Sequence, residues 1–368
     1  MIQKVKIGII GTGNICPTYI KILKSFEIFD LAACADINVE KAMKVARDFD
    51  VPRACSIADL LSDSDIEIVL NLTPPVAHSD VSLRVLQNGK SVYSEKPLAL
   101  TREAAQKMIG LAGEKHLRIG CAPDTFLGAG IQTCRKLIDD GAIGRPIAAT
   151  AFFLNHGHED WHPDPEFFYQ EGGGPMFDMG PYYLTALISL LGPVARVSGS
   201  TRLTFPERAI GSQPKKGEKF RVEIPTHITG LLEFANGVIG TIITSFDVWG
   251  HTLPHMEIYG GQGTLFLPDP NTFGGPVGLL QARADSREEV PLIRGYAENS
   301  RGLGAADMAT AIQSGRMHRA NEHLAYHILD IMLAIHDSAS MGQHIRIEST
   351  CSRPAPLPAN LPGGYLDD

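Results

Sequence analysis

The stretch VKIGIIGTGNI (residues 5–15) decides the fold class. Its apolar run over 5–10 predicts a short buried strand, and Gly11-Thr12-Gly13 predicts a tight turn into a helix. Apolar side chains then recur at helical spacing, at Ile15, Tyr19, Ile22, Leu23 and Phe26. A helix that begins here directs free backbone N–H groups toward the turn, where a pyrophosphate can bind. The stretch therefore predicts the first unit of a dinucleotide-binding domain.

The glycine motif is incomplete, because Cys16 stands where its third glycine would be. Asp36 supports the same interpretation, since it follows the apolar run 31–35 at about the 20-residue interval at which an acidic side chain binds ribose hydroxyls. Its charge would repel a 2′-phosphate, and neither Ile37 nor Asn38 supplies a compensating arginine. NAD is therefore favoured over NADP. The alternative is a tight turn beside a solvated Asp36.

The rest of the first third alternates apolar runs with helical patterns, as in a parallel sheet with crossover helices. Strands are expected over 5–10, 31–35, 66–72, 91–94 and 118–122, with helices over 76–87 and 102–114. This predicts a doubly wound α/β Rossmann domain over residues 1–123.

Longer β-like runs follow, and they predict a second α/β domain over 124–350 with a mainly antiparallel sheet. Strands are expected over 147–155, 194–204, 227–234, 238–246 and 256–259, and helices over 130–139, 181–191 and 322–341. Asn236-Gly237 is a strong hairpin signal between two of these strands. The segment 206–219 is expected to be an exposed loop, and 351–368 a proline-rich tail.

Composition limits the class of protein. The 368 residues are 44% hydrophobic and 20% charged, which favours two globular domains. The 33 basic against 41 acidic residues give a charge of −8, which argues against nucleic acid as a partner. The six cysteines form no C-x-x-C pair, and neither a signal peptide nor a membrane-spanning run is apparent. A cytoplasmic protein is expected.

Two further segments follow strands and therefore lie at the carboxyl edge of the sheet, where such folds bind ligands. One is Asn71-Leu72-Thr73-Pro74-Pro75, and the other is Glu95-Lys96-Pro97. A lysine at this edge can bind a substrate hydroxyl beside a nicotinamide. The alternatives are a rigid proline turn in the first segment and an exposed ion pair in the second. His78 is expected either at the cofactor or on the solvated surface.

The most unusual stretch of the second domain is GGGPMFDMGPYY (residues 172–183). Pro181 favours a helix start there. Asp178 and Tyr182 are four positions apart, so a helical turn would bring them together. A carboxylate and a phenol beside a lysine can take the proton of an alcohol while hydride leaves its carbon. The alternative is a capping Asp178 with Tyr182 in the core.

Histidines offer candidate metal ligands, but their spacing completes no known site. They are His156, His158 and His162, His251 with His255, and His323 with His327. The pattern H-E-x-x-H is absent, so no catalytic metal is expected.

Taken together, these motifs resemble the Gfo/Idh/MocA family, which includes glucose-fructose oxidoreductase and inositol dehydrogenase. The matching residues are Gly11-Thr12-Gly13-Asn14-Ile15, Asp36, Asn71–Pro75, Glu95-Lys96-Pro97, and Gly172–Gly174 with Asp178-x-Gly180. The resemblance implies a Rossmann domain and a second domain whose large open sheet makes a homodimer or homotetramer.

The resemblance also implies site residues. Lys96 and Asp178 would line the nicotinamide and the substrate, and Tyr182, which stands where most members have histidine, would transfer the proton. The cofactor would also contact Leu72, Thr73, Pro74, His78 and Glu95, together with Trp161 and His162, which align with a Trp-Arg pair of some relatives. Asp124, in a segment that departs from the family pattern, is expected to bind sugar hydroxyls.

The expected function is an NAD-dependent dehydrogenase that oxidises a secondary hydroxyl of a sugar, a sugar derivative or a cyclic polyol. One alternative uses the same site and a transient oxidation to process a glycoside. The other is a regulator that binds NAD without chemistry, against which Lys96 and Asp178 argue.

Overall fold

The computed structural model describes residues 4–292, 295–358 and 366, and the chain divides into two compact units. Unit 1 takes its residues from 1–128, 293–326 and 354–368, and unit 2 from 129–292 and 327–353. The sequence predicts a change of domain at 123, near the end of the first segment. It does not predict that later segments return to unit 1, because the contacts that return them join residues far apart in the chain.

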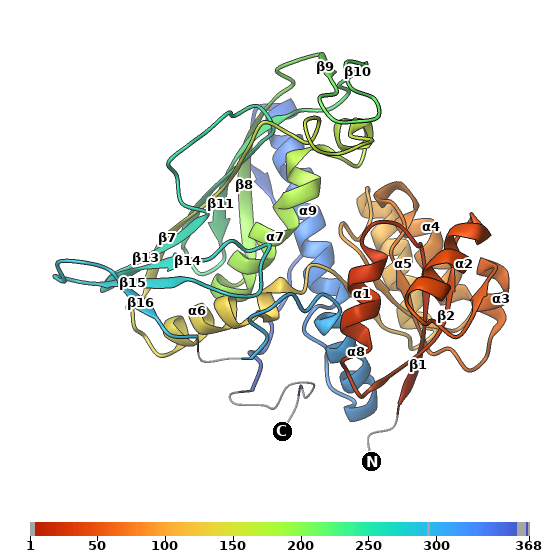
Figure 1. Ribbon diagram of the computed structural model, residues 1–368. Helices are drawn as coiled ribbons and strands as arrows, with labels where there is room; N and C mark the ends of the chain where they lie inside the picture. Colours follow the sequence, from red (N-terminus) through yellow and green to blue (C-terminus); the bar gives the residue numbers. More distant parts are fainter. Residues whose placement is uncertain (1–3, 293–294, 359–365, 367–368) are drawn as a thin grey trace. The chain divides into compact units, whose positions relative to one another are not determined.

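Unit 1 is built on a six-stranded parallel sheet with the order β3-β2-β1-β4-β5-β6 (Figure 1). The strands are β1 (Val5–Ile10), β2 (Phe29–Ala35), β3 (Ala54–Cys55), β4 (Ile68–Asn71), β5 (Ser91–Ser94) and β6 (Ile119–Cys121). The helices are α1 (Cys16–Leu23), α2 (Val39–Asp48), α3 (Ile57–Ser62), α4 (His78–Gln87), α5 (Arg102–Glu114) and α8 (Leu303–Ser314), with single turns η1 (Pro75–Ala77) and η2 (Thr125–Leu127). The predicted α/β class and doubly wound sheet are confirmed.

Unit 2 is built on a nine-stranded sheet with the order β16-β15-β14-β13-β7-β12-β11-β8-β17. Among its described strands, only β7 and β12 pair in parallel. The strands are β7 (Pro146–Leu154), β8 (Val194–Arg202), β11 (His227–Phe234), β12 (Ile239–Ser245), β13 (Met256–Gly260), β14 (Gly263–Leu267), β15 (Val277–Gln281), β16 (Glu288–Val290) and β17 (Ile345–Arg346). The predicted hairpin at Asn236-Gly237 is present, with Gly237 at a φ of 90° between β11 and β12.

Helices cover one face of this sheet. They are α6 (Ala129–Asp139), α7 (Gly174–Leu191) and α9 (Glu322–Met341), of which α9 belongs to unit 2 from residue 327 onward (Figure 1). Gly199 of β8 lets α9 approach closely, because a Cβ on it would lie 2.3 Å from the carbonyl oxygen of Ile335. Inward side chains such as Ile228 and Ile242 are completely buried against these helices. The core of unit 2 therefore lies on this face.

One prediction about unit 2 is wrong, and another holds only in part. Helix α7 begins at Gly174 rather than at Pro181, because Gly173 ends the extended backbone and Pro175 takes the first helical turn, which leaves Pro181 inside the helix. The segment 206–219 is also more ordered than an exposed loop. It contains β9 (Glu207–Ala209), which pairs with β10 (Lys219–Arg221), and the Arg208 side chain is buried.

His327 links the start of β8 to the end of the chain in unit 2. Its Nε2 accepts a hydrogen bond from the backbone N–H of Val194 at 3.0 Å, and its Nδ1 lies 2.8 Å from Ser349 Oγ. Burial lowers the pKa of His327 to about 4, although Asp330 and Ser349 act to raise it. The imidazole is therefore neutral in the folded protein at neutral pH, as its acceptor role requires.

This lowered pKa makes the fold sensitive to acid. At a pH above the usual histidine pKa, the neutral His327 ring stabilises the folded chain. This stabilisation is lost as the pH falls toward 4, because the unfolded chain binds the proton more tightly than the folded one. Between pH 7 and pH 5 we expect a loss of about 2 kcal/mol in the free energy of unfolding from this one group. Urea unfolding of His327→Gln at both pH values should show a pH-dependent loss smaller by that amount. An equal loss in the two proteins would contradict the assignment.

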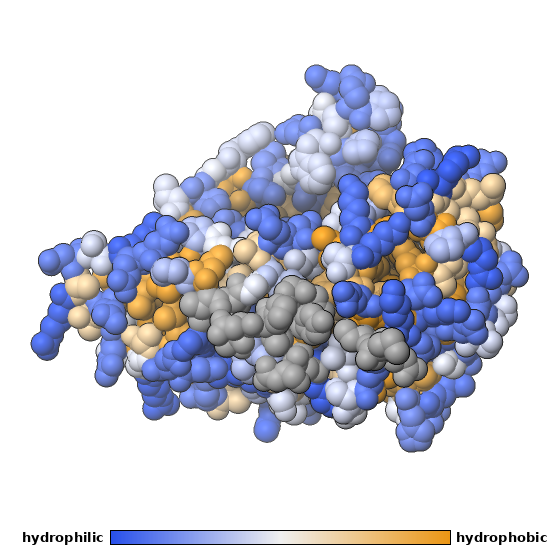
Figure 2. Space-filling model, turned by 60° about the horizontal axis from the view of Figure 1, so that its bottom comes forward, coloured by the Kyte–Doolittle hydropathy of each residue, from blue (hydrophilic) through white to orange (hydrophobic). Residues whose placement is uncertain are grey.

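The surface is mostly hydrophilic in the face that Figure 2 presents, with apolar areas between the hydrophilic side chains. All six cysteines are free, as their spacing predicts. Within the described residues, no helix combines the length and apolarity that a bilayer crossing requires.

Candidate functional site

The turn after β1 has the geometry of a dinucleotide loop. Gly11 has a φ of 99°, and a Cβ on it would lie 2.6 Å from the carbonyl carbon of Leu72, so only glycine fits between β1 and the end of β4. A Cβ on Gly13 would meet nothing within 4 Å, so the backbone there faces open space. Cys16 is completely buried at the start of α1, where the third glycine of the motif would pack.

Asp36 lies immediately after β2 and is tied to this turn. Its Oδ2 accepts hydrogen bonds from the backbone N–H and the hydroxyl of Thr12 at 2.8 and 2.9 Å, and its Oδ1 accepts one from the Asn38 N–H at 2.9 Å. Burial raises the pKa of Asp36, but these hydrogen bonds outweigh it, so the pKa falls below its usual value. The side chain is a carboxylate at neutral pH, positioned beside the glycine turn rather than simply solvated.

The loop after β4 is held by its own polar groups. Asn71 Nδ2 donates to the carbonyl of His78 at 2.9 Å and to Ser82 Oγ at 3.0 Å, and the Thr73 hydroxyl donates to Asn71 Oδ1 at 2.6 Å. Leu72, Thr73 and Pro74 therefore have a fixed path at the carboxyl edge of the sheet.

His78 is neither solvated nor open to a ligand. Its ring is 1% exposed, with Nδ1 2.7 Å from the carbonyl oxygen of Pro97 and Nε2 2.7 Å from that of Thr73. Burial lowers the pKa of His78, while the two carbonyls act to raise it. The expected direct contact of His78 with the cofactor is thus corrected: the ring joins the loop after β4 to the loop after β5 and positions both.

The loop after β5 carries Glu95 and Lys96. Glu95 Oε1 accepts a hydrogen bond from the buried Tyr19 hydroxyl at 2.7 Å, and Oε2 accepts one from the Lys96 N–H at 3.1 Å. The Glu95 N–H in turn donates to the carbonyl of Asn71 at 2.9 Å. These bonds connect α1, β4 and β5 at the same edge of the sheet, and they fix the backbone from which the Lys96 side chain extends.

Asp124 does not have the role expected for it. The side chain is buried, and its Oδ2 accepts hydrogen bonds from the N–H groups of Gly302 and Gly304 at 2.8 and 2.9 Å, at the start of α8. Burial raises the pKa of Asp124 to about 6, although those two hydrogen bonds act to lower it. A carboxylate used in this way caps a helix of unit 1, and its burial does not fit a direct contact with substrate hydroxyls.

Two substitutions separate these roles. Asp124→Ala should lower the free energy of unfolding by about 1–2 kcal/mol, because both N–H groups lose their acceptor. Asp124→Asn keeps an acceptor without a buried charge, so unfolding and kcat should both stay close to those of the parent chain. Urea titrations and initial rates would check this. A loss of kcat of about 100-fold in a stably folded Asp124→Asn would restore the substrate role.

In unit 2, α7 carries two of the three predicted catalytic side chains. Asp178 and Tyr182 lie one helical turn apart, and Gly173 rather than Asp178 occupies the N-cap position. The capping alternative for Asp178 is therefore excluded. Asp178 Oδ2 lies 3.0 Å from Nε2 of His158, and Tyr182 is 9% exposed.

His158 is the residue that the sequence does not single out for this chemistry. Its segment also holds Trp161 and His162, whose rings lie 5.4 Å apart at their centroids. Trp161 is 62% exposed, and the Nδ1 of His162 accepts a hydrogen bond from the Asp164 N–H at 3.0 Å. Sequence spacing suggests His158 only as a metal ligand. Among the described residues, no three His, Cys, Asp or Glu side chains come together as a metal site would need.

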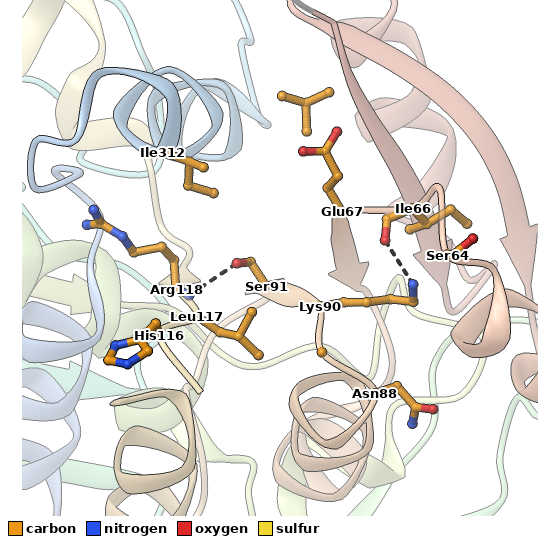
Figure 3. Close-up of a pocket in the computed structure, with 12 residues that line it drawn as sticks. Ser64, Ile66, Glu67, Asn88, Lys90, Ser91, His116, Leu117, Arg118 and Ile312 are labelled. Atoms are coloured by element: carbon orange, nitrogen blue, oxygen red, sulfur yellow. Dashed lines mark hydrogen bonds between the residues drawn. The ribbon is translucent and has the colours of Figure 1, made fainter. Parts of the chain in front are cut away.

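Unit 1 also has a cavity of about 610 Å³ at the opposite, amino edge of its sheet (Figure 3). Ser91, Arg118 and Ile312 line it, and the Arg118 N–H donates to Ser91 Oγ at 3.1 Å. Lys90 is buried beside it with its Nζ 2.9 Å from the Ile66 carbonyl oxygen. Ligands of doubly wound sheets bind at the carboxyl edge, so this cavity is separate from the candidate site.

The fold and the glycine turn define a two-unit protein with a dinucleotide-binding domain. Two family profiles identify its family. The profile of the oxidoreductase family with an NAD-binding Rossmann fold matches residues 5–122, and the profile of the GFO/IDH/MocA C-terminal domain matches residues 131–266. The chain belongs to the Gfo/Idh/MocA family.

The relatives of named activity are dehydrogenases and a reductase. Levoglucosan dehydrogenase of Pseudarthrobacter phenanthrenivorans is 24% identical over 72% of this chain and 73% of its own. The 1,5-anhydro-D-fructose reductase of Ensifer adhaerens is 27% identical over 80% and 84%. The scyllo-inositol 2-dehydrogenase (NAD(+)) of Bacillus subtilis is 23% identical over 95% and 98%. The chain is an NAD(P)-dependent oxidoreductase.

Solved structures have the same fold. Levoglucosan dehydrogenase in complex with NADH and L-sorbose superposes with a TM-score of 0.80 at 22% identity, over 94% of this chain and 99% of that one. An NAD-binding oxidoreductase from Klebsiella pneumoniae gives a TM-score of 0.82 at 20% identity, over the same shares.

The described residues of unit 1 fit NAD. The space over Gly13 leaves room for a pyrophosphate at the backbone, and the ionised Asp36 beside the turn can accept the ribose hydroxyls. The loops that carry Thr73 and Lys96 follow β4 and β5, so both lie at the carboxyl edge of the sheet. The strand order changes direction nearby, between β1 and β4.

Proposed function

We propose that this protein is an NAD-dependent dehydrogenase that oxidises a secondary hydroxyl of a sugar, a sugar derivative or a cyclic polyol. The observation that carries the proposal is the pair Asp178 and Tyr182, one turn apart on α7, in a chain that also has Lys96 after β5. The activities named for the relatives, on levoglucosan, anhydrofructose and inositol, support the substrate class.

The proposed chemistry divides between these side chains. NAD, when bound, supplies the hydride acceptor. Lys96 orients the hydroxyl and stabilises the oxygen as its proton leaves, Tyr182 takes that proton, and Asp178 positions both groups. A phenol normally titrates near 10, and each unit by which its pKa falls requires about 1.4 kcal/mol of stabilisation, which a nearby cation can provide.

Asp36 supports NAD rather than NADP as the preferred cofactor. Its carboxylate is ionised and lies beside the glycine turn, where a 2′-phosphate would be repelled. Ile37, the next residue, is 92% exposed and offers no cation to such a phosphate.

A panel of polyols, free sugars and glycosides, run separately with NAD and NADP, tests the proposal by absorbance at the reduced nicotinamide. We expect reduction with at least one sugar or polyol and with NAD over NADP. Glycoside cleavage without accumulation of reduced cofactor would replace the proposal by the transient-oxidation alternative. Binding of NAD without turnover of any member would favour the regulator.

We also propose a cytoplasmic homodimer or homotetramer that associates through the sheet of unit 2. The face opposite the helices carries apolar side chains at the surface, among them Leu231 on β11 and Ile239 on β12, which are 36% and 52% exposed. Such a face is typical of a subunit interface. Sedimentation should show a mass above one chain, and Leu231→Glu with Ile239→Glu should lower it. A single-chain mass for the parent protein would contradict the proposal.

A further inference from the structure

We propose that His158 is the positioning residue of Asp178, the side chain that fixes the carboxylate for its part in catalysis. The inference rests on the proposed function, in which Asp178 positions the groups that act on the reacting hydroxyl.

The contact joins two segments that are distant in the sequence. His158 lies in the connection between β7 and the single turn η3 (Glu166–Tyr169), whereas Asp178 lies on α7. His158 Nε2 and Asp178 Oδ2 are 3.0 Å apart, and the two side chains are 9% and 15% exposed. A carboxylate oxygen accepts here, so Nε2 carries the proton and donates. A hydrogen bond that an ionised carboxylate accepts is stronger where little water reaches it than on the protein surface.

Aromatic rings hold the imidazole in place. Its ring centroid is 3.9 Å from that of Phe168, 4.8 Å from that of Phe246 and 5.1 Å from that of Trp161. The backbone is fixed as well, because the His158 N–H donates to the hydroxyl of Tyr169 at 3.2 Å. The imidazole therefore has little freedom to turn away from Asp178, which is the property that a positioning group requires.

The other ring nitrogen shows that packing alone does not account for a histidine. Nδ1 of His158 is buried and has no hydrogen-bond partner among the described residues. A buried polar atom without a partner costs about 1–3 kcal/mol, and a phenylalanine would fill the same aromatic surroundings without that cost. The imidazole is thus less favourable for stability than an apolar ring, and its one polar contact is with Asp178.

The consequence for catalysis is geometric. With Oδ2 held by a fixed donor, the position of this carboxylate oxygen is defined relative to α7, and so relative to Tyr182 one turn later. A displacement of about 1 Å in a group that positions reacting atoms can lower the rate by about 100-fold. His158 would thereby affect kcat without touching substrate or cofactor.

The test compares His158→Phe, which keeps the aromatic packing and removes the donor, with His158→Gln, whose Nε2 can still donate to Asp178. We expect His158→Phe to lower kcat by about 10-fold to 100-fold with little change in the KM for NAD, and His158→Gln to recover most of that loss. His156→Phe is the matched control. Its ring stacks on Trp249 at 3.4 Å and should tolerate the change.

A mutant cycle and two crystal structures complete the test. In an Asp178→Ala background, His158→Phe should cause no further loss, because the two residues act as one unit. Crystals should show Asp178 rotated in His158→Phe and unmoved in His158→Gln. An unmoved carboxylate in His158→Phe overturns the inference whether or not the enzyme has been found active, whereas an inactive parent chain with a rotated carboxylate overturns only the proposed function. Full turnover by His158→Phe would also overturn the inference.

Discussion

Replacing Lys96 by methionine is expected to lower kcat by about 1,000-fold while NAD still binds. Methionine has nearly the same length and fills the same space, but it cannot hold a positive charge beside the hydroxyl oxygen. Removing one group that stabilises developing charge costs about 100-fold to 1,000-fold, and the loss of assistance to proton transfer adds to it. The backbone should be unaffected, because the Lys96 N–H still donates to Glu95 Oε2.

The measurement pairs kinetics with binding. Initial rates on the best substrate of the panel give kcat, and quenching of intrinsic fluorescence gives the dissociation constant of NAD. Lys44→Met is the matched control, because Lys44 is an exposed lysine that pairs with Asp48 on the surface of α2. Turnover by Lys96→Met at more than about a tenth of the parent rate would remove Lys96 from the chemistry.

The parts of the fold that the sequence predicts well are those whose pattern is local. Strands 5–10 and 91–94 and the helices over 102–114 and 322–341 have the predicted bounds, because each has a clear apolar run or period. Helix α2 is missing from the predicted elements, although its apolar residues Val39, Ala42, Met43 and Ala46 recur at helical spacing. Its pattern is local as well, so this helix could have been predicted from the sequence.

Whether a pattern is local also decides which site residues could be predicted. The turn at Gly11 and the acid at Asp36 are read from neighbouring residues, so they could be predicted. Asp124 could not, because the N–H groups that it caps belong to α8, far along the chain. His158 is similar, since its partner Asp178 lies beyond η3 on α7. Partners that only tertiary structure brings together leave no spacing in the sequence.

Asp36→Asn combined with Ile37→Arg is expected to reverse cofactor preference, raising the ratio of kcat/KM for NADP to that for NAD by about 1,000-fold. The asparagine removes the charge that repels a 2′-phosphate, and its amide oxygen can still accept the hydrogen bond from the Thr12 N–H. The arginine, at a position that is 92% exposed, adds a cation for that phosphate. Together these changes correspond to about 4 kcal/mol, at about 1.4 kcal/mol for each factor of ten.

Two controls define what the double substitution does. Ile37→Arg alone should change the ratio less, because the Asp36 carboxylate still opposes the phosphate and competes for the arginine. Asp48→Asn, which removes an equal charge from the far end of α2, should leave the ratio unchanged. If Asp48→Asn moved the ratio as far as the double substitution, the effect would come from net charge. An unchanged ratio in the double variant would show that the adenosine ribose lies away from Asp36, and the preference for NAD would then need another source.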